Sequence, residues 1–159
     1  ARMPKPLIKK NNLFEVINEN INLLNKIDSS IKIKIVNHLP KKNYVNFDYE
    51  QFNRLFFNLI KNSIESIQEK AQKDNKIDKN IDIEIRERRD YIIINLLDTG
   101  VGFRDKKTKD LIKPYFTTKE KGTGLGLSIV DKIISDHNGS IKFLNHKNGA
   151  KIEIIIPKK

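Results

Sequence analysis

The chain has no cysteine among its 159 residues, which excludes disulfide bonds, thiolate zinc sites and a cysteine nucleophile. This absence fits a reducing compartment, so we expect a cytoplasmic protein. The sequence also lacks an apolar run long enough to span a membrane, and its start, "ARMPKP", has neither an initiator Met nor a signal-peptide pattern. We expect an excised segment without membrane contact of its own, and an inner-membrane anchor elsewhere in the parent protein is compatible with this.

The net charge of +11 raises the possibility of nucleic-acid binding. The excess is almost all lysine and is scattered along the chain, which is typical of solvated surfaces. The sequence has no zinc-finger spacing, no RNP-like aromatic strand and no basic segment followed by heptads. A basic nucleic-acid-binding module therefore remains an alternative, and our expectation is no direct contact with nucleic acid.

The hydrophobic pattern predicts one domain that mixes helices and strands. Apolar residues recur at helical spacing over residues 11–27, over a helix that Asp48 caps and that runs to about Ala71, and over 125–137. Short alternating or apolar segments predict strands at 31–37, 44–47, 81–87, 91–97, 141–144 and 151–156. Residues 99–123 lack such periodicity, which is typical of a long functional loop.

A glycine-rich stretch, "PYFTTKEKGTGLGLSIV" (114–130), ends that loop and leads into the third helix. Glycines before a helix let backbone N–H groups approach an anion such as phosphate, although hinge glycines are equally common. The spacing of Gly122, Gly124 and Gly126 does not fit G-x-G-x-x-G because residue 127 is leucine. The Walker pattern is absent as well, so neither a dinucleotide fold nor a P-loop is predicted.

Asn58, Asn62 and Glu65 occur four and three residues apart in the second predicted helix, which places them on one face. An amide oxygen is a suitable Mg²⁺ ligand when phosphates and water supply the others. The alternative is a solvated polar surface.

The stretch "LLDTGVGF" (96–103) ends an apolar strand with an aspartate and two glycines. The Asp98 carboxylate can accept a hydrogen bond from an exocyclic amine, and the glycines leave room for a flat ring, so adenine is a suitable ligand. An ordinary turn is the plain alternative. The stretch also resembles the active-site loop of retroviral-type aspartic proteases, but that family is almost all strand.

The order of "FNLIKNSIES", "DTGVGF", "PYFTT" and "GTGLGLSIV" resembles the N, G1, F and G2 boxes of the histidine-kinase catalytic domain, in the GHKL ATP-binding superfamily. The resemblance covers about residues 11–156, and "ARMPKP" is similar to the segment after the dimerisation helices in nitrogen-sensor kinases of the NtrY type. It implies the Bergerat ATP-binding fold, an α+β two-layer sandwich with about three helices on one face of a mixed, roughly five-stranded sheet. Residues 1–10 would end the linker, and 11–159 would form the catalytic domain with a lid at about 103–123.

The resemblance also implies the roles of individual residues. Asn62 would ligate Mg²⁺, Asn58 would contact phosphate or the metal's water, and Asp98 would bind the adenine amine. The other implied ATP-binding positions are Gly100 and Gly102 under the base, Phe116 and Lys119 in the lid, and Gly122, Thr123, Gly124, Leu125 and Gly126 around the triphosphate.

Three residues depart from the family pattern or separate its branches. Ser63 stands where the family usually has alanine, and Glu65 where many members have lysine. Superfamily ATPases related to gyrase, Hsp90 and MutL have a glutamate base at the position of Asn58, and an amide cannot deprotonate water. Transfer onto an acceptor is therefore favoured over hydrolysis, and an ATPase-type molecular machine is the alternative.

No histidine of this chain resembles the family's phosphoacceptor. His38, His137 and His146 fall at a predicted strand end, a helix end and a turn, where surface or capping roles are ordinary. We therefore expect only the ATP-binding catalytic half of a protein-histidine kinase. It would transfer the γ-phosphoryl of Mg-ATP to a histidine on a separate dimerisation domain of the same parent. A response regulator would act downstream, and the fragment itself would be monomeric.

Overall fold

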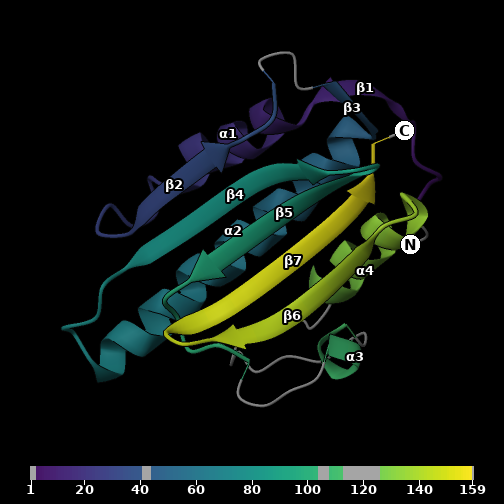
Figure 1. Ribbon diagram of the computed structural model, residues 1–159. Coiled ribbons are helices and arrows are strands. Elements are labelled where there is room, and N and C mark those ends of the chain that lie inside the picture. Colours follow the sequence, from purple (N-terminus) through teal and green to yellow (C-terminus); the bar gives the residue numbers. More distant parts are fainter. Residues whose placement is uncertain (1–2, 41–43, 104–107, 113–125, 159) are drawn as a thin grey trace.

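The computed structural model describes residues 3–40, 44–103, 108–112 and 126–158 of the chain (Figure 1). Its helices are α1 (Leu13–Leu24), α2 (Tyr49–Lys73), α3 (Thr108–Leu111) and α4 (Gly126–Asp136). Its strands are β1 (Lys9–Asn12), β2 (Lys32–Asn37), β3 (Tyr44–Phe47), β4 (Asn80–Arg88), β5 (Tyr91–Asp98), β6 (Ser140–His146) and β7 (Gly149–Pro157).

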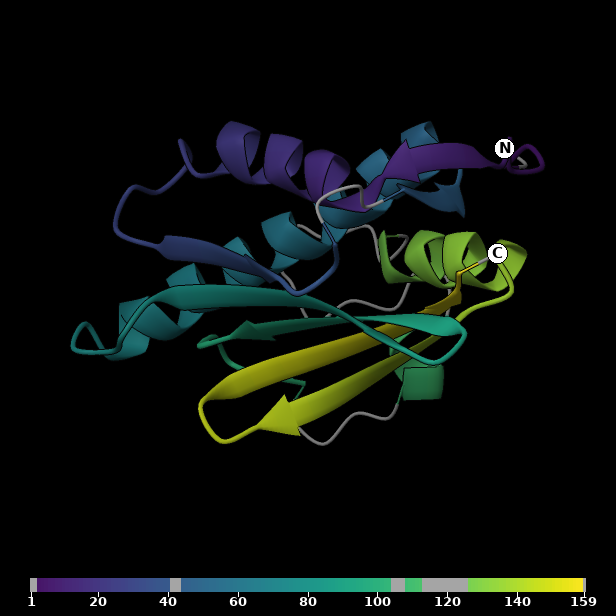
Figure 2. The same cartoon turned by 45° about the horizontal axis from the view of Figure 1, so that its top comes forward.

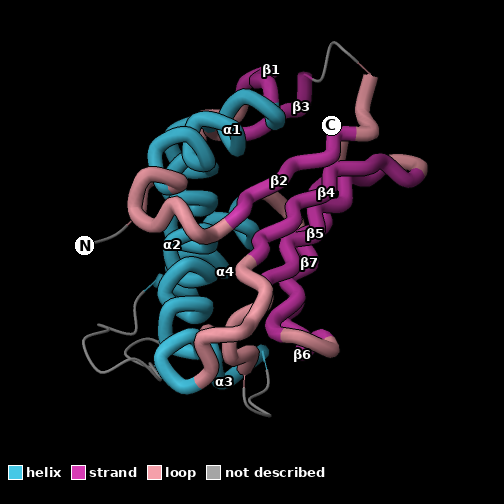
Figure 3. The backbone as a smooth tube through the Cα atoms, turned by 90° about the vertical axis from the view of Figure 1, so that its left-hand side faces the viewer, coloured by secondary structure: helices cyan, strands magenta, loops and turns pink. Residues whose placement is uncertain are grey.

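A mixed five-stranded sheet forms one layer of the molecule, in the order β2-β4-β5-β7-β6. Strands β2 and β4 are parallel, and the other neighbours are antiparallel. Each strand presents alternate residues to one face, so the isoleucines at 81, 83 and 85 of β4 are buried on the side of the helices. Figure 3 shows α1, α2 and α4 on that side and the sheet on the other, which confirms the predicted two-layer sandwich.

Helix α2 is the centre of the helical layer and lies between α1 and α4 (Figure 2). Its N-cap is Asp48, whose side chain accepts a hydrogen bond from the Gln51 N–H, as the sequence predicted. The predicted apolar stripe of α2 is buried in full, at Phe52, Leu55, Phe56, Leu59, Ile60, Ile64 and Ile67. Burial of this stripe fixes which side of α2 faces away from the core, and that side carries the predicted site residues.

Two elements differ from the sequence prediction. Residues 9–12 form strand β1, which pairs with β3 in a separate two-stranded sheet, so the first helix begins at Leu13 and not at residue 11. A short helix, α3, lies inside the predicted lid, where Leu111 is buried in the core. Strand β1 is wholly polar in sequence, and α3 is too short to show a helical period. Within the described residues, none of the helices has the length and apolar character needed to cross a membrane.

Candidate nucleotide-binding site

Asp98 is buried at the end of β5, where three segments distant in sequence meet. Its Oδ1 accepts hydrogen bonds from the Gly100 N–H at 2.9 Å and from the Ala150 N–H of β7 at 3.2 Å. The Ser63 hydroxyl of α2 also donates to the Asp98 carboxylate. The side chain is therefore held in one orientation before any ligand arrives.

Burial raises the pKa of the Asp98 carboxyl above its ordinary value of 3.8, because the charged form loses hydration. The hydrogen bonds from Gly100, Ser63 and Ala150, together with the charge of Lys70, oppose this shift by stabilising the carboxylate. Each of these four neighbours is thus a donor or a cation. This arrangement favours a carboxylate that can accept one further hydrogen bond. Accepting from an adenine amine is the role predicted for Asp98.

Glycines allow the backbone around Asp98 to pack more closely than other residues would. A Cβ added to Gly149 would lie 2.1 Å from the Asp98 carbonyl oxygen, and one added to Gly100 would lie 2.2 Å from the Ser66 Oγ of α2. The Ser66 Oγ also accepts a hydrogen bond from the Val101 N–H at 2.9 Å. The segment after β5 is therefore attached both to α2 and to the β6–β7 hairpin.

Gly102 has a φ of +74°, a conformation that favours glycine. The next residue, Phe103, donates its N–H to the Asn145 Oδ1 at 2.8 Å, and its ring packs edge-on against Phe143 at 5.5 Å between centroids. Phe103 thus attaches the start of the predicted lid to β6, and α3 contacts the same strand. Leu111 is buried in the core, and Ile112 packs against it. These residues give the start of the predicted lid apolar contacts with the core.

The predicted phosphate end lies nearer the start of α2. Asn58, Asn62, Ser66 and Lys70 follow one another at four-residue intervals, so they lie along one side of the helix. Asn58 and Asn62 are half-buried, as is Glu65. A Cβ added to Gly126, the first residue of α4, would lie 4.0 Å from the Asn62 Nδ2. The structure therefore brings Asn62 to the amino-terminal end of α4, where backbone N–H groups favour an anion.

The remaining predicted ligands of the triphosphate and lid lie outside the described residues. They are Phe116, Lys119, Gly122, Thr123, Gly124 and Leu125. Among the site residues that are described, Asp98, Gly100 and Gly102 form one group beside Ser63 and Ser66, and Asn62 and Gly126 form the other. Helix α2 connects the two groups.

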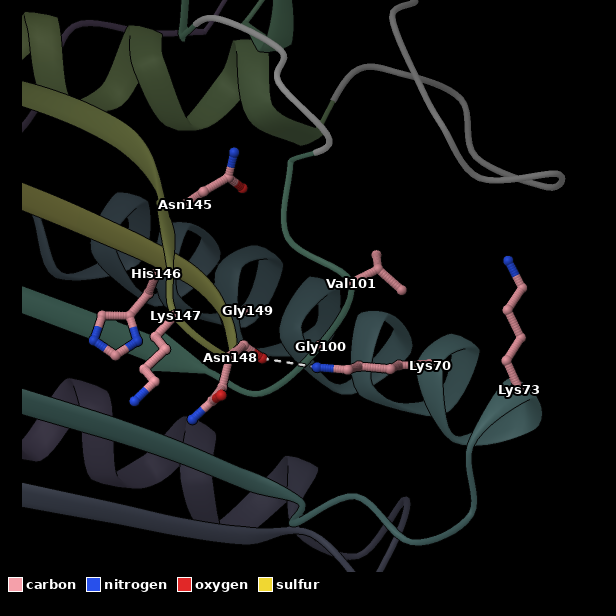
Figure 4. Close-up of a pocket in the computed structure, with 9 residues that line it drawn as sticks. All are labelled: Lys70, Lys73, Gly100, Val101, Asn145, His146, Lys147, Asn148 and Gly149. Atoms are coloured by element: carbon pink, nitrogen blue, oxygen red, sulfur yellow. Dashed lines mark hydrogen bonds between the residues drawn. The ribbon is translucent and has the colours of Figure 1, made fainter.

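A hollow of about 510 Å³ adjoins the site at Gly100 (Figure 4). Lys70 and Lys73 of α2, Val101, and the hairpin residues 145–149 form the rest of its lining. The Lys70 Nζ crosses it to donate to the Asn148 carbonyl at 2.9 Å. Because its lining includes none of Asn58, Asn62 and Asp98, the hollow borders the predicted nucleotide site without coinciding with it.

Several residues that build the site were not predicted from the sequence. Ser63 drew attention only as a departure from a family pattern. Asn145, Gly149 and Ala150 belonged only to the connection between the last two predicted strands, 141–144 and 151–156. Their contacts join positions far apart in sequence, 52 residues in the case of Ala150 and Asp98. The short glycine-containing turn before the last strand was the available signal that something approaches the backbone there.

Comparison with known proteins identifies the family. The family described as histidine kinase-, DNA gyrase B-, and HSP90-like ATPase matches residues 47–159. The nitrogen regulation protein NtrY of Azorhizobium caulinodans is 30% identical over 149 residues, which are 94% of this chain and 19% of that protein. Sporulation kinase A of Bacillus subtilis is 37% identical over 117 residues, which are 73% of this chain and 18% of that protein.

A solved structure agrees with these sequence relationships. The catalytic domain of histidine kinase ThkA superposes with a TM-score of 0.80 and 28% identity, covering 95% of each chain. This chain therefore belongs to the histidine kinase-, DNA gyrase B- and HSP90-like ATPase family and has the fold of a histidine-kinase catalytic domain. It spans about a fifth of the length of the curated relatives named above.

Proposed function

We propose that this chain binds Mg-ATP and transfers its γ-phosphoryl group to a histidine on a separate dimerisation domain. The observation that carries the proposal is the buried Asp98, surrounded by donors and joined through α2 to Asn62 at the start of α4. The adenine amine would donate to Asp98, and the phosphates would lie between Asn62 and the amino-terminal end of α4. Its similarity to histidine-kinase catalytic domains supports the same reaction.

Asn58 favours transfer to an acceptor over hydrolysis. An amide at this half-buried position cannot remove a proton from water, whereas the ATPases of the superfamily carry a glutamate there. In the proposed reaction an imidazole nitrogen of the acceptor attacks the γ-phosphorus, the bond between that phosphorus and the bridging oxygen breaks, and ADP leaves. The chain's contribution is positioning and charge neutralisation, which account for most phosphoryl-transfer catalysis.

Asn62 is the residue proposed to hold Mg²⁺. Its amide is half-buried beside the phosphate end, and one amide ligand fits an ion that keeps several waters and binds mainly to phosphate oxygens. The ion would neutralise charge on the phosphates. Asn58, one turn before Asn62, would contact phosphate or a water of the ion.

Two partners and a setting follow from the proposed reaction. The acceptor is a histidine-bearing dimerisation domain of the same parent, and the phosphoryl group would pass on to a response regulator. Histidine kinase ThkA has been solved in complex with the response regulator protein TrrA, which supports the second partner. Because the reaction consumes ATP, we place it in the cytoplasm.

Radiolabelled ATP tests the proposed function directly. The chain alone should label little, whereas the chain with a fragment bearing the acceptor histidine should give an acid-labile, alkali-stable label on that fragment. Asn62→Ala should reduce this labelling by about a hundredfold or more, since it removes electrostatic stabilisation of the transferring group. Asn75→Ala, at an exposed amide in the loop after α2, is the matched control and should leave labelling unchanged.

Two outcomes would contradict the proposal. Rapid phosphate release by the chain alone would favour an ATPase, and an alkali-labile label would indicate a carboxyl acceptor.

A further inference from the structure

Helices α2 and α4 contact each other near both ends of α4. At one end, Gly126 of α4 approaches Asn62 of α2. At the other end, His137 follows the last turn of α4 and packs its ring against Phe52 of α2, with 4.6 Å between centroids. The two helices are therefore antiparallel, and at about 1.5 Å of rise per residue the two contacts lie about 16 Å apart along the axis of α4.

The hydrogen bonds of His137 fix its tautomer. The side chain is buried, with 6% of its surface exposed. Its Nε2 lies 3.0 Å from the Asp48 backbone N–H, which can only donate, so Nε2 must be the acceptor. The hydrogen of the neutral ring is therefore on Nδ1, which donates to the Ile133 carbonyl at 2.7 Å. His137 is thus buried, and of the surface and capping roles expected for a histidine at a helix end it has the capping role.

The partner of His137, Asp48, is the N-cap of α2. Its Oδ1 accepts from the Gln51 N–H at 3.0 Å, and its Oδ2 accepts from the Leu7 N–H at 2.7 Å. The Ile133 carbonyl belongs to the last turn of α4. His137 therefore connects the Ile133 carbonyl in the last turn of α4, which also accepts from the His137 backbone N–H, to the N-cap residue of α2. Asp48 in turn also holds the amino-terminal segment.

The two ends of the proposed nucleotide site depend on this connection to different degrees. Asp98 is held by β5, by β7 and by Ser63 of α2, and none of these contacts involves α4. The phosphate end requires α4, because Gly126 has to lie next to Asn62. Loss of the His137 acceptor would leave the buried Asp48 N–H unpaired, and a shift of α4 that relieves this would move its opposite end away from Asn62.

We propose that His137 is a positioning residue for phosphate binding: through Asp48 it sets the alignment of α4 on α2, and so the distance between Asn62 and the start of α4. The inference rests on the proposed function, since it assumes that the phosphates lie between these two groups. His137 takes no part in the reaction itself and touches no ligand. Its effect is selective, acting on the phosphates and not on the adenine.

The test compares the affinities of the 159-residue chain for two ligands, a non-hydrolysable ATP analogue with Mg²⁺ and adenosine, by calorimetry or NMR titration. His137→Phe keeps a ring against Phe52 and removes both polar contacts. This substitution should lower the affinity for the ATP analogue about tenfold, which is the effect expected when a buried donor loses its acceptor. Adenosine should bind within about twofold of wild type, because its contacts do not involve α4.

Conservative variants separate positioning from folding. Glutamine can place an oxygen where Nε2 lies, so His137→Gln should restore most of the affinity for the ATP analogue. Asparagine is too short to reach the Asp48 N–H, so His137→Asn should behave like His137→Phe. If the phenylalanine variant does not fold, the comparison of His137→Gln with His137→Asn tests the positioning role instead. Leu24→Ala, at the end of α1, is the control for general destabilisation and should keep the wild-type ratio of the two affinities.

If His137→Phe lowered the affinities for both ligands equally, His137 would have a merely structural role and the inference would be overturned. An unchanged affinity for the ATP analogue would overturn it as well. The inference would also be overturned if the wild-type chain bound the ATP analogue no more tightly than adenosine. If the wild-type chain binds neither ligand, the proposed function itself fails and this inference fails with it.

Discussion

The two ends of the proposed nucleotide site are built in different ways. At the adenine end, Asp98 is only 5% exposed, accepts hydrogen bonds from two backbone N–H groups, and lies against glycines that leave no room for a side chain. At the phosphate end, Asn58 and Asn62 are half-buried, and the nearest described part of α4 is the backbone of Gly126. One end is a packed junction of strands, and the other is a meeting of two helices.

This difference assigns different tasks to the two ends. A rigid acceptor for the adenine gives specificity, because a poorly matched base would leave a buried carboxylate without its donor. In the proposed reaction the phosphate end binds a highly charged group and then releases ADP, so its affinity depends on the relative placement of the two helices. Changes at the adenine end should therefore affect the fold as well as binding, and those at the phosphate end mainly binding and transfer.

The largest expected effect on stability is that of Gly149→Ala. Its Cβ would lie 2.1 Å from the Asp98 carbonyl oxygen and 2.8 Å from the Gly100 nitrogen, and neither backbone atom can move without disturbing β5. We expect a loss of about 3 kcal/mol in the free energy of unfolding, measured by urea denaturation, and weak adenosine binding. The exposed neighbour Asn148, changed to alanine, should stay within about 0.5 kcal/mol of wild type. A Gly149→Ala chain as stable as wild type would show that the junction is not tightly packed.

Asp98→Asn should have the next largest effect, on ligand binding. The substituted amide would bring an NH₂ group toward the Gly100, Ala150 and Ser63 donors, and it would weaken the acceptor for the adenine amine. A nucleotide at about a hundred times its Kd should stabilise the wild-type chain by about 2.7 kcal/mol, and the variant should lose most of that gain. Thermal unfolding with and without nucleotide measures this gain in stability. Asp90→Asn, at an exposed turn, is the control, and an equal gain in both variants would remove Asp98 from the site.

Much of the fold followed from the sequence because its helices and strands have strong periodicity. The stripe of α2 and the Asp48 cap were predicted from local spacing alone, and both are confirmed. Strand β1 was missed because its sequence, KKNN, has no apolar residue to show an alternation. Helix α3 was missed because its four residues are too few for a helical period to show. The adenine end was predicted only in part, since Asp98 lies in a recognisable motif whereas Ala150 and Gly149 reach it through the sheet. The contact of His137 with Asp48 was not predicted for the same reason, because the two residues are 89 positions apart.

The pH dependence of adenosine binding should distinguish the buried Asp98 from an ordinary surface carboxylate. Burial raises the pKa of Asp98 in the folded chain above 3.8, so the carboxyl takes up its proton at a higher pH when folded than when unfolded. As the pH falls toward that raised pKa, this group makes the unliganded fold relatively more stable, and its contribution is lost as the pH rises again. Adenosine binding should change in the opposite direction, because a protonated carboxyl accepts poorly from the amine.

Titration of adenosine affinity against pH measures this effect. Wild-type affinity should begin to fall at a pH above 3.8, whereas the residual affinity of Asp98→Asn should show no such dependence in that range. Identical pH profiles for the two chains would contradict the raised pKa.

Ser63→Ala should have the smallest effect of this series, and it tests whether the adenine end is held from α2 as well as from the strands. The Ser63 hydroxyl donates to Asp98 and lowers its pKa, so its removal should raise that pKa further and move the loss of adenosine affinity to higher pH. We expect about 1 kcal/mol of lost binding free energy at neutral pH, the usual contribution of one hydrogen bond to a carboxylate. Unfolding should change little, since Gly100 and Ala150 still satisfy Oδ1. Ser140→Ala, at an exposed position of β6, is the matched control. If Ser63→Ala left both the affinity and its pH profile unchanged, the strands alone would orient Asp98, and α2 would contribute only to the phosphate end.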